Sequence, residues 1–153
     1  MANTYTQLLV QIVFAVKGRH SVITETHREQ VEKYICGVIG GKQSKPLAIY
    51  CNPDHCHVLI GINTSTSISE LVRVIKSNSS KYINENKWMV GNFEWQEGYG
   101  AFSYIRSQLD SVVNYILNQP ERHRKSTFRQ EYLQLLREFE ISFEEKYVFD
   151  FLD

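Results

Sequence analysis

The order of elements along this 153-residue chain predicts an α+β fold, a ferredoxin-like two-layer sandwich with an antiparallel sheet and additional C-terminal helices. One observation predicts the fold class, and a second predicts a single domain. Apolar runs rich in β-branched residues alternate with segments of helical periodicity in the order strand, helix, strand, strand, helix, strand. No internal repeat or low-complexity linker interrupts the chain, and a hydrophobic content of 42% is sufficient for one core. We therefore expect one domain spanning residues 1–153.

The first half of the chain contributes three of the expected strands. Leu8–Val16 is an apolar, β-rich run and predicts the first strand. A helix is expected over about 24–41, where capping residues precede apolar side chains at helical spacing and a glycine pair follows them. Pro46–Cys51 and His55–Ile62 predict the second and third strands, which pair antiparallel because only the turn 52–54 separates them. In a ferredoxin-like sheet the first and third strands lie in the middle.

The second half of the chain completes the sheet and adds helices. A polar segment with good capping residues, 64–70, precedes apolar side chains that recur at helical spacing as far as Ile83. The remaining expected elements are, in chain order, a strand over Tyr99–Ile105, a helix capped by Ser107 or Asp110 and ended before Pro120, and a last helix over about Ser126–Phe139.

Charge is distributed unevenly, although the chain has 17 basic and 17 acidic residues. The acidic tail, residues 138–153, holds six acids and one lysine, so its net charge is −5 and that of the rest is +5. A mildly basic body permits a polyanionic partner without requiring one. The three cysteines lack paired spacing, which argues against a disulfide framework or a cysteine zinc site. Because neither a signal peptide nor a membrane span is predicted, we expect a cytoplasmic protein with no membrane partner.

The segment Asp54-His55-Cys56-His57 opens the third expected strand. Side chains alternate between the faces of a strand, so His55 and His57 point to one side while Cys56 points to the other. A shared divalent cation would satisfy one nitrogen of each imidazole. The alternative is a pair of partly exposed histidines at a strand end, and the local pattern alone favours it. A catalytic metal also needs further ligands from elsewhere in the chain.

Tyr115 and Gln119 stand one helical turn apart, on the same face of the helix that ends before Pro120. Taken alone, they indicate a partly buried tyrosine and a helix-terminal glutamine. The pair gains meaning only in combination with the two histidines.

Three blocks of this sequence together resemble the small HUH transposases with a single catalytic tyrosine, the IS200-like enzymes of insertion sequences that move as single-stranded DNA. The blocks are Asp54–Ile60, Phe93–Ser103 and Tyr115–Gln119. They occur in the family's order at compatible spacings, and the resemblance spans nearly the whole chain, from the first strand to Tyr147–Asp150. This resemblance, and not the spacing, changes the interpretation of the histidine pair to a metal site.

The resemblance implies a transposase that nicks and rejoins DNA with Mg²⁺ or Mn²⁺. It places the ion on His55, His57 and Gln119, and it makes Tyr115 the nucleophile that forms a covalent 5′-phosphotyrosine. Because that linkage preserves the bond energy, rejoining needs no nucleotide cofactor. The resemblance also implies single-stranded DNA with subterminal hairpins as the partner, a homodimer, and a bacterial or archaeal host. No acceptor for the outer nitrogen of His57 can be identified from the sequence.

The chain departs from the family's pattern in two places. The middle residue of the histidine motif is usually a bulky aliphatic, and here it is Cys56, which we interpret as a small buried hydrophobic residue and not as a nucleophile. Relatives often carry two adjacent histidines after the tyrosine block, whereas Arg122-His123 stands here. His123 is therefore interpreted as a solvated residue at a helix end.

Basic residues outside these blocks are the candidates for phosphate contacts, which set the affinity for DNA and its dependence on salt. They are Lys17, Arg19, Arg73, Lys76, Lys81, Arg122, Arg124 and Lys125. Tyr99, Phe102 and Trp95 are candidates for stacking on unpaired bases, with burial in the core as the ordinary alternative for the last two.

Three other functions stay open at this point. A domesticated relative that processes repeated palindromes, or a replication or mobilisation nickase, would use the same chemistry. A non-catalytic module that binds single-stranded nucleic acid is the alternative from another class, because a ferredoxin-like sheet also serves as a binding platform.

Overall fold

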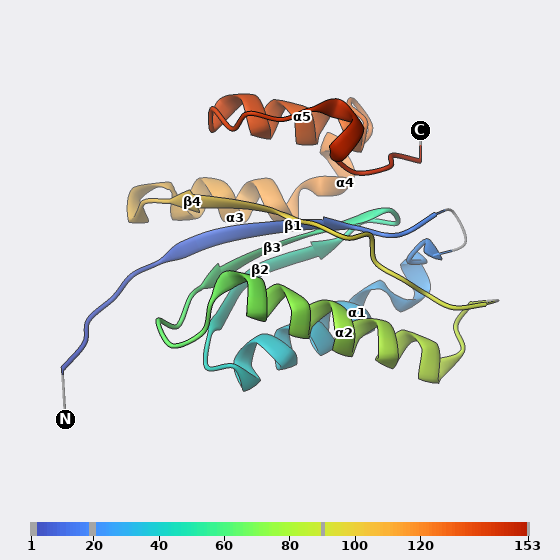
Figure 1. Ribbon diagram of the computed structural model, residues 1–153, viewed down its shortest axis with the longest axis horizontal. Coiled ribbons are helices and arrows are strands. Elements are labelled where there is room, and N and C mark those ends of the chain that lie inside the picture. Colours follow the sequence, from blue (N-terminus) through green and yellow to red (C-terminus); the bar gives the residue numbers. More distant parts are fainter. Residues whose placement is uncertain (1–2, 19–20, 90, 153) are drawn as a thin grey trace.

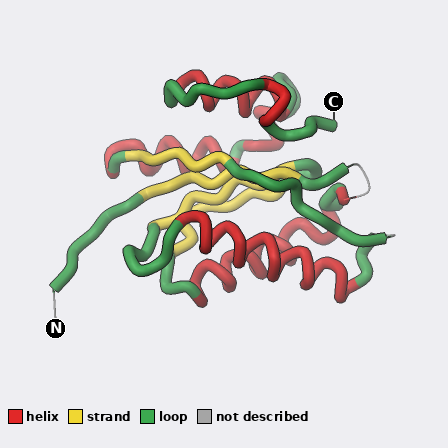
Figure 2. The backbone as a smooth tube through the Cα atoms, viewed as in Figure 1, coloured by secondary structure: helices red, strands yellow, loops and turns green. Residues whose placement is uncertain are grey.

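The computed structural model describes residues 3–18, 21–89 and 91–152, and its centre is a four-stranded antiparallel sheet (Figures 1 and 2). The strands are β1 (Leu9–Ala15), β2 (Lys45–Cys51), β3 (His55–Gly61) and β4 (Gly100–Tyr104). They are arranged in the order β2-β3-β1-β4. The predicted α+β class, with the first and third strands in the middle of the sheet, is confirmed.

Helices cover both faces of the sheet, so the C-terminal helices form a third layer (Figure 1). The helices α1 (Glu25–Gly41) and α2 (Ile68–Asn86) pack on one face. The opposite face is covered by α3 (Leu109–Leu117), α4 (Gln119–Arg122) and α5 (Phe128–Glu138). None of the helices in the described part of the chain combines the length and the apolar character that a membrane span requires.

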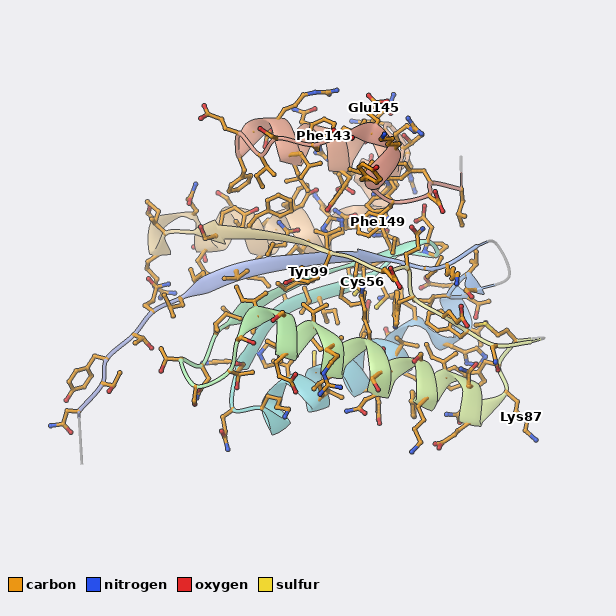
Figure 3. The ribbon with its side chains drawn as sticks, in the orientation of Figure 1. Cys56, Lys87, Tyr99, Phe143, Glu145 and Phe149 are labelled. Carbon is orange, nitrogen blue, oxygen red and sulfur yellow. The ribbon has the colours of Figure 1, made fainter. Side chains whose placement is uncertain are left out.

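The alternation of side chains along β1 and β3 divides the core into two halves. Ile12, Phe14 and Cys56 are fully buried against α1 and α2, which confirms the interpretation of Cys56 as a buried residue (Figure 3). His57 pairs with Val13, and His55 with Ala15, across the β1–β3 ladder. Because directly paired residues share a face, both histidines point toward the layer formed by α3, α4 and α5.

The segment around α3 differs from the prediction in how its helices begin and end. Neither Ser107 nor Asp110 caps α3, because a 3₁₀ turn over Arg106–Gln108 comes first and the Gln108 side chain accepts a hydrogen bond from the Ile105 backbone N–H at 3.0 Å. The chain then leaves the α3 conformation at Asn118 and starts α4 with proline in its first turn. Proline is tolerated there because the first turn of a helix needs no internal N–H partner.

The acidic tail folds back onto α5, and its aromatic side chains provide the contact. Phe149 is buried, with its ring centroid 5.8 Å from that of Phe128 and 4.8 Å from that of Tyr132. The acidic side chains of the described part of the tail are exposed, as Glu145 is in Figure 3. Phe128 and Tyr132 belong to α5, so this packing fixes the position of that helix over the sheet.

Candidate active site

The two histidines of β3 converge with a carboxylate that comes from α5. Both imidazoles are buried, and their ring centroids lie 5.0 Å apart. Nε2 of His55 lies 3.3 Å from Oε1 of Glu131, and Nε2 of His57 lies 3.1 Å from the same oxygen. The cluster therefore brings together two residues of a central strand and one residue some 75 positions later in the sequence.

The outer nitrogens of both histidines have acceptors that set their orientation. Nδ1 of His55 lies 2.6 Å from Oδ1 of Asp54, and Nδ1 of His57 lies 2.6 Å from Oε1 of Gln11. A carboxylate or amide oxygen only accepts, so each Nδ1 carries the hydrogen and each Nε2 points into the cluster. Gln11 in turn donates from Nε2 to the hydroxyl of Tyr104 at 2.8 Å.

Glu131 is the functional residue that the sequence analysis missed. Its side chain is buried, and its carboxylate accepts hydrogen bonds from the Tyr115 hydroxyl and from Nε2 of Gln119 at 2.9 Å. Nε2 of His123 lies 3.1 Å from the same carboxylate. A signal was available, because Glu131 lies between Phe128 and Tyr132 on the buried stripe of its helix. A glutamate on such a stripe is rarely buried without partners.

The charges in this cluster depend on one another. Burial alone raises the pKa of Glu131, but His57, His123 and His55 outweigh it and hold that pKa well below the ordinary range. Burial and the adjacent Glu131 charge raise the pKa of Tyr115 far above its usual value. Burial opposes the charged form of His55, yet Asp54 and Glu131 raise its pKa. For His57 burial prevails, and the pKa is lowered.

The structure brings Tyr115 and Gln119 to the histidine pair, although a helix boundary separates them. The Tyr115 ring packs edge-on against His57, with centroids 5.6 Å apart. Gln119 is fully buried and accepts at Oε1 from Asn52 at 2.9 Å. Both side chains meet at Oε2 of Glu131.

His123 differs from the solvated helix-end residue that the sequence analysis favoured. Its Nε2 lies 2.9 Å from Oε1 of Gln119, and its ring centroid lies 4.9 Å from that of His55. Its Nδ1 lies 2.9 Å from the backbone oxygen of Ser126. His123 therefore belongs to the polar cluster, because the turn after α4 directs it back toward the sheet.

The expected DNA-contacting residues separate into two groups. Arg122, Arg124 and Lys125 follow Gln119 and lie beside the cluster. The others lie elsewhere with local partners: Lys17 with Glu94 at 3.2 Å, Arg73 with Glu70 at 2.6 Å, Lys81 with Glu85 at 3.9 Å, and Lys76 with the backbone oxygens of Gln96 at 2.7 Å and Gly98 at 2.6 Å. Arg19 lies outside the described residues.

Two of the three candidate base-stacking aromatics are core residues. Phe102 is 1% exposed and Trp95 is 8% exposed, with the indole N–H donated to Ser79 at 2.9 Å. Tyr99 remains partly exposed. Stacking by Trp95 or Phe102 is therefore excluded in this conformation, because neither ring presents a face to solvent.

Two open grooves flank the cluster. One, of about 560 Å³, is lined by Tyr115 together with Asn118, Arg122 and Lys125. The other, of about 530 Å³, is lined by Asp54 and His123 together with Arg124 and Lys125. Lys125 lines both grooves, and a basic wall beside a buried polar cluster suits an anionic chain.

The residues present fit a divalent cation. One ligand atom each from His55, His57 and Glu131 lies within 4.8 Å of the others, and all three side chains are buried. Two imidazole nitrogens and an ionised carboxylate oxygen are ordinary ligands for such an ion. The buried His-His-Glu group can thus bind a metal, and Gln119 is within hydrogen-bond distance of its carboxylate.

Comparisons with known proteins place this site in a family context. A family model described as "Transposase IS200 like" matches residues 4–119. Among solved structures, a candidate transposase from Deinococcus radiodurans R1 is similar at 19% identity and a TM-score of 0.61, covering 78% of this chain and 95% of that one. A REP-associated tyrosine transposase bound to a REP hairpin is similar at 16% identity and a TM-score of 0.61, covering 100% of this chain and 93% of that one. A comparison with curated proteins gives no significant match.

Proposed function

Because this chain belongs to the IS200-like transposase family, we propose that it nicks and rejoins single-stranded DNA through a covalent 5′-phosphotyrosine intermediate, with a bound divalent metal. The observation that carries the proposal is the position of Tyr115, whose hydroxyl lies inside the cluster of His55, His57 and Glu131. A phenol buried at an ion-binding cluster beside a basic groove is suited to attack a phosphodiester.

In this proposal His55 and His57 hold Mg²⁺ or Mn²⁺, with Glu131 or Gln119 as the third ligand. When bound, the ion would draw negative charge from the phosphate and position it. Asp54 and Gln11 keep the imidazoles oriented through their Nδ1 hydrogens. A carboxylate ligand reduces the net charge of the bound ion, whereas an amide leaves it unchanged, so the choice between Glu131 and Gln119 affects the reaction.

Tyr115 is the nucleophile. A bond forms between its phenolic oxygen and phosphorus, and the bond from phosphorus to the 3′ oxygen breaks. The hydroxyl proton lies on the hydrogen bond to Oε2 of Glu131, which is the atom placed to receive it. The 3′ oxygen takes up one proton in exchange, so the step consumes no cofactor. Rejoining is the same step in reverse, with a 3′-hydroxyl attacking the phosphotyrosine.

The partner in this proposal is single-stranded DNA with a hairpin, in the cytoplasm of a bacterial or archaeal cell. Support comes from the relative that was solved with a REP hairpin, whose likeness extends over the whole of this chain. The same observation favours a second candidate, an enzyme that processes repeated palindromes instead of moving an element. The two differ in the DNA around the gene: hairpin ends flanking it indicate mobility, and dispersed repeats indicate processing.

A homodimer is also proposed, but the site itself draws on one chain. Tyr115 and His57 of the same chain are in ring contact. We therefore propose that cleavage occurs in cis. Mixing a Tyr115→Phe variant with a His57→Ala variant tests this: the mixture should stay inactive, whereas restored adduct formation would show that the tyrosine acts on the partner's site.

The experiment that tests the function is covalent trapping. The protein is incubated with a hairpin-bearing single strand and Mn²⁺, and an adduct that survives denaturation is measured. The wild type should form the adduct and Tyr115→Phe should not. Tyr147→Phe, which alters a tyrosine that is 77% exposed, is the matched control and should react normally. If wild type forms no adduct on any hairpin-bearing strand, or Tyr115→Phe forms as much, the proposal fails.

A further inference from the structure

We propose that Arg122 is a further catalytic residue, whose guanidinium binds a non-bridging oxygen of the scissile phosphate while it lies over the ring of Tyr115. This inference rests on the proposed function and goes beyond a general phosphate contact. It also concerns a position at which this chain departs from the family's usual histidine.

Arg122 is held beside the nucleophile by two contacts. Its Cζ lies 5.1 Å from the centroid of the Tyr115 ring, and its Nε lies 3.4 Å from Oε2 of Glu131. The same Oε2 accepts the Tyr115 hydroxyl hydrogen. The guanidinium therefore stands next to the oxygen that attacks and next to the carboxylate that accepts the hydroxyl hydrogen bond.

The remaining hydrogen-bonding capacity of Arg122 faces the groove. Nε is buried on the side of Glu131 and makes no hydrogen bond, so the donors left for the groove are the two terminal nitrogens, which form no hydrogen bond with the described residues. The side chain is 38% exposed and lines the 560 Å³ groove together with Tyr115 and Lys125. A planar guanidinium with unused donors at the edge of a groove matches the two non-bridging oxygens of a phosphodiester.

The charge of Glu131 explains why a cation is needed at this place. Its side chain is buried and its Oε2 accepts the hydrogen of the Tyr115 hydroxyl, so the cluster presents a carboxylate directly beside the nucleophile. That anion repels an approaching phosphate, and the repulsion grows as negative charge accumulates on the non-bridging oxygens. Arg122 lies against the same carboxylate and offsets this repulsion where the charge develops.

The neighbouring cations are not placed for this role. Arg124 is 77% exposed and pairs with Glu121 at 3.5 Å. Lys125 lines both grooves. Within the described part of the chain, however, the cation that lies over the Tyr115 ring is that of Arg122 and not that of Lys125. Phosphate contacts from these two residues would add affinity for the strand as a whole, whereas Arg122 acts at the reacting atoms.

The test separates binding from reaction. Single-turnover adduct formation is measured at saturating hairpin DNA for wild type, Arg122→Gln and Arg122→Lys, and DNA affinity is measured in a Tyr115→Phe background. Arg122→Gln should slow the saturated rate by about 100-fold or more, as for loss of one preorganised donor, and should change the affinity by only a few fold. The saturated rate of Arg122→Lys should lie between those of wild type and Arg122→Gln, because lysine keeps the positive charge but loses the planar pair of donors that binds two oxygens at once. Arg137→Gln, which removes an equal charge from an exposed position on α5, is the control and should match wild type.

A substrate change distinguishes a direct contact from a structural effect. Replacing one non-bridging oxygen of the scissile phosphate by a methyl group gives two stereoisomers. If Arg122 binds one of those oxygens, the corresponding isomer should slow wild type by a larger factor than it slows Arg122→Gln. Equal factors in both proteins, or an unchanged saturated rate in Arg122→Gln, would overturn the inference. If wild type itself forms no adduct, the proposed function fails and the inference falls with it.

Discussion

Oε1 of Gln11 lies 2.6 Å from Nδ1 of His57, and this contact joins the two central strands of the sheet at the cluster. The Gln11 amide is fixed at its other end, since Nε2 donates to the Tyr104 hydroxyl on β4. Three adjacent strands thus determine how one imidazole is oriented. A ligand held in this way keeps Nε2 directed at the ion site before any ion binds.

Replacing Gln11 with leucine should weaken metal binding while leaving the fold intact. Without this acceptor, the tautomer and the ring orientation of His57 are no longer fixed. Such changes typically lower metal affinity by about 10- to 100-fold. Calorimetric titration with Mn²⁺ measures the change in metal affinity. Gln134→Leu is the matched control, because Gln134 is an exposed glutamine on α5. Equal affinities in the two variants would mean that Gln11 does not support the ligand.

Glu131→Gln and Gln119→Ala together should identify the third ligand. Glu131→Gln keeps the shape and removes the anion. If the carboxylate binds the ion, this variant should need at least about tenfold more Mn²⁺ for half-maximal binding, and Gln119→Ala should have a smaller effect. The opposite ranking would assign the ligand to Gln119, as the family resemblance implies. Thermal melting without metal checks that both variants fold.

The strands and their order follow from patterns that are local in the sequence. Leu8–Val16 and His55–Ile62 are apolar apart from Gln11, His55 and His57, because a central strand is buried on both faces. β1 and β3 lie within one residue of those bounds. The start of α3 did not follow, because a 3₁₀ turn over Arg106–Gln108, closed by the Gln108 side chain on the Ile105 N–H, leads into α3 and no side chain caps that helix. Short side chains are the commoner caps, and only the tertiary path of the chain selects among neighbours.

The site was only partly predictable for a different reason. The alternation rule places His55 and His57 on one face, and the family's motif points to Tyr115 and Gln119, which the structure brings to the same cluster. Glu131 comes from α5, which lies beyond the residues that the family model matches. The position of α5 over the sheet depends on the packing of aromatic residues from the acidic tail. A contact between residues this far apart in the sequence cannot be predicted from the spacing of nearby residues.

Glu131 should also make the stability of the protein sensitive to acid. Its pKa in the folded state is depressed from an ordinary value of 4.5, so its contribution to stability is complete above that value and is lost as the pH falls. Urea unfolding midpoints measured from pH 7 down to pH 3 should therefore decline less steeply in Glu131→Gln than in wild type. Parallel curves would show that the carboxylate is not held as an anion in the folded state.

Tyr104 should contribute to loss of stability in alkali. Burial raises its pKa to about 12 from an ordinary 10, against the opposing hydrogen bond from Gln11. The folded state binds the phenolic proton more firmly than the unfolded state, so this contribution is present below pH 10 and is lost between pH 10 and 12. In that window the melting temperature of Tyr104→Phe should fall less than that of wild type. A fall as steep as that of wild type would rule out this assignment.

Gly100 should be indispensable to the site although it lies outside the cluster. A Cβ at this position would stand 2.7 Å from the Tyr132 hydroxyl oxygen and 2.9 Å from another atom of the same ring. Gly100→Ala must therefore displace Tyr132, and with it the adjoining Glu131 on α5. We expect a loss of about 1–3 kcal/mol in unfolding free energy, as for other overpacked cores, together with slower adduct formation and weaker Mn²⁺ binding.

The matched variant for this prediction is Gly37→Ala, because a Cβ at Gly37 would meet nothing within 4 Å in the middle of α1. Alanine there should raise the unfolding free energy by roughly 0.5–1 kcal/mol through helix propensity, with no effect on the cluster. Chemical denaturation and adduct assays on the two variants compare the same substitution in two environments. If Gly100→Ala keeps wild-type Mn²⁺ affinity and adduct rate, then the packing of Tyr132 on β4 does not determine where Glu131 lies, and the cluster must be held by its own hydrogen bonds.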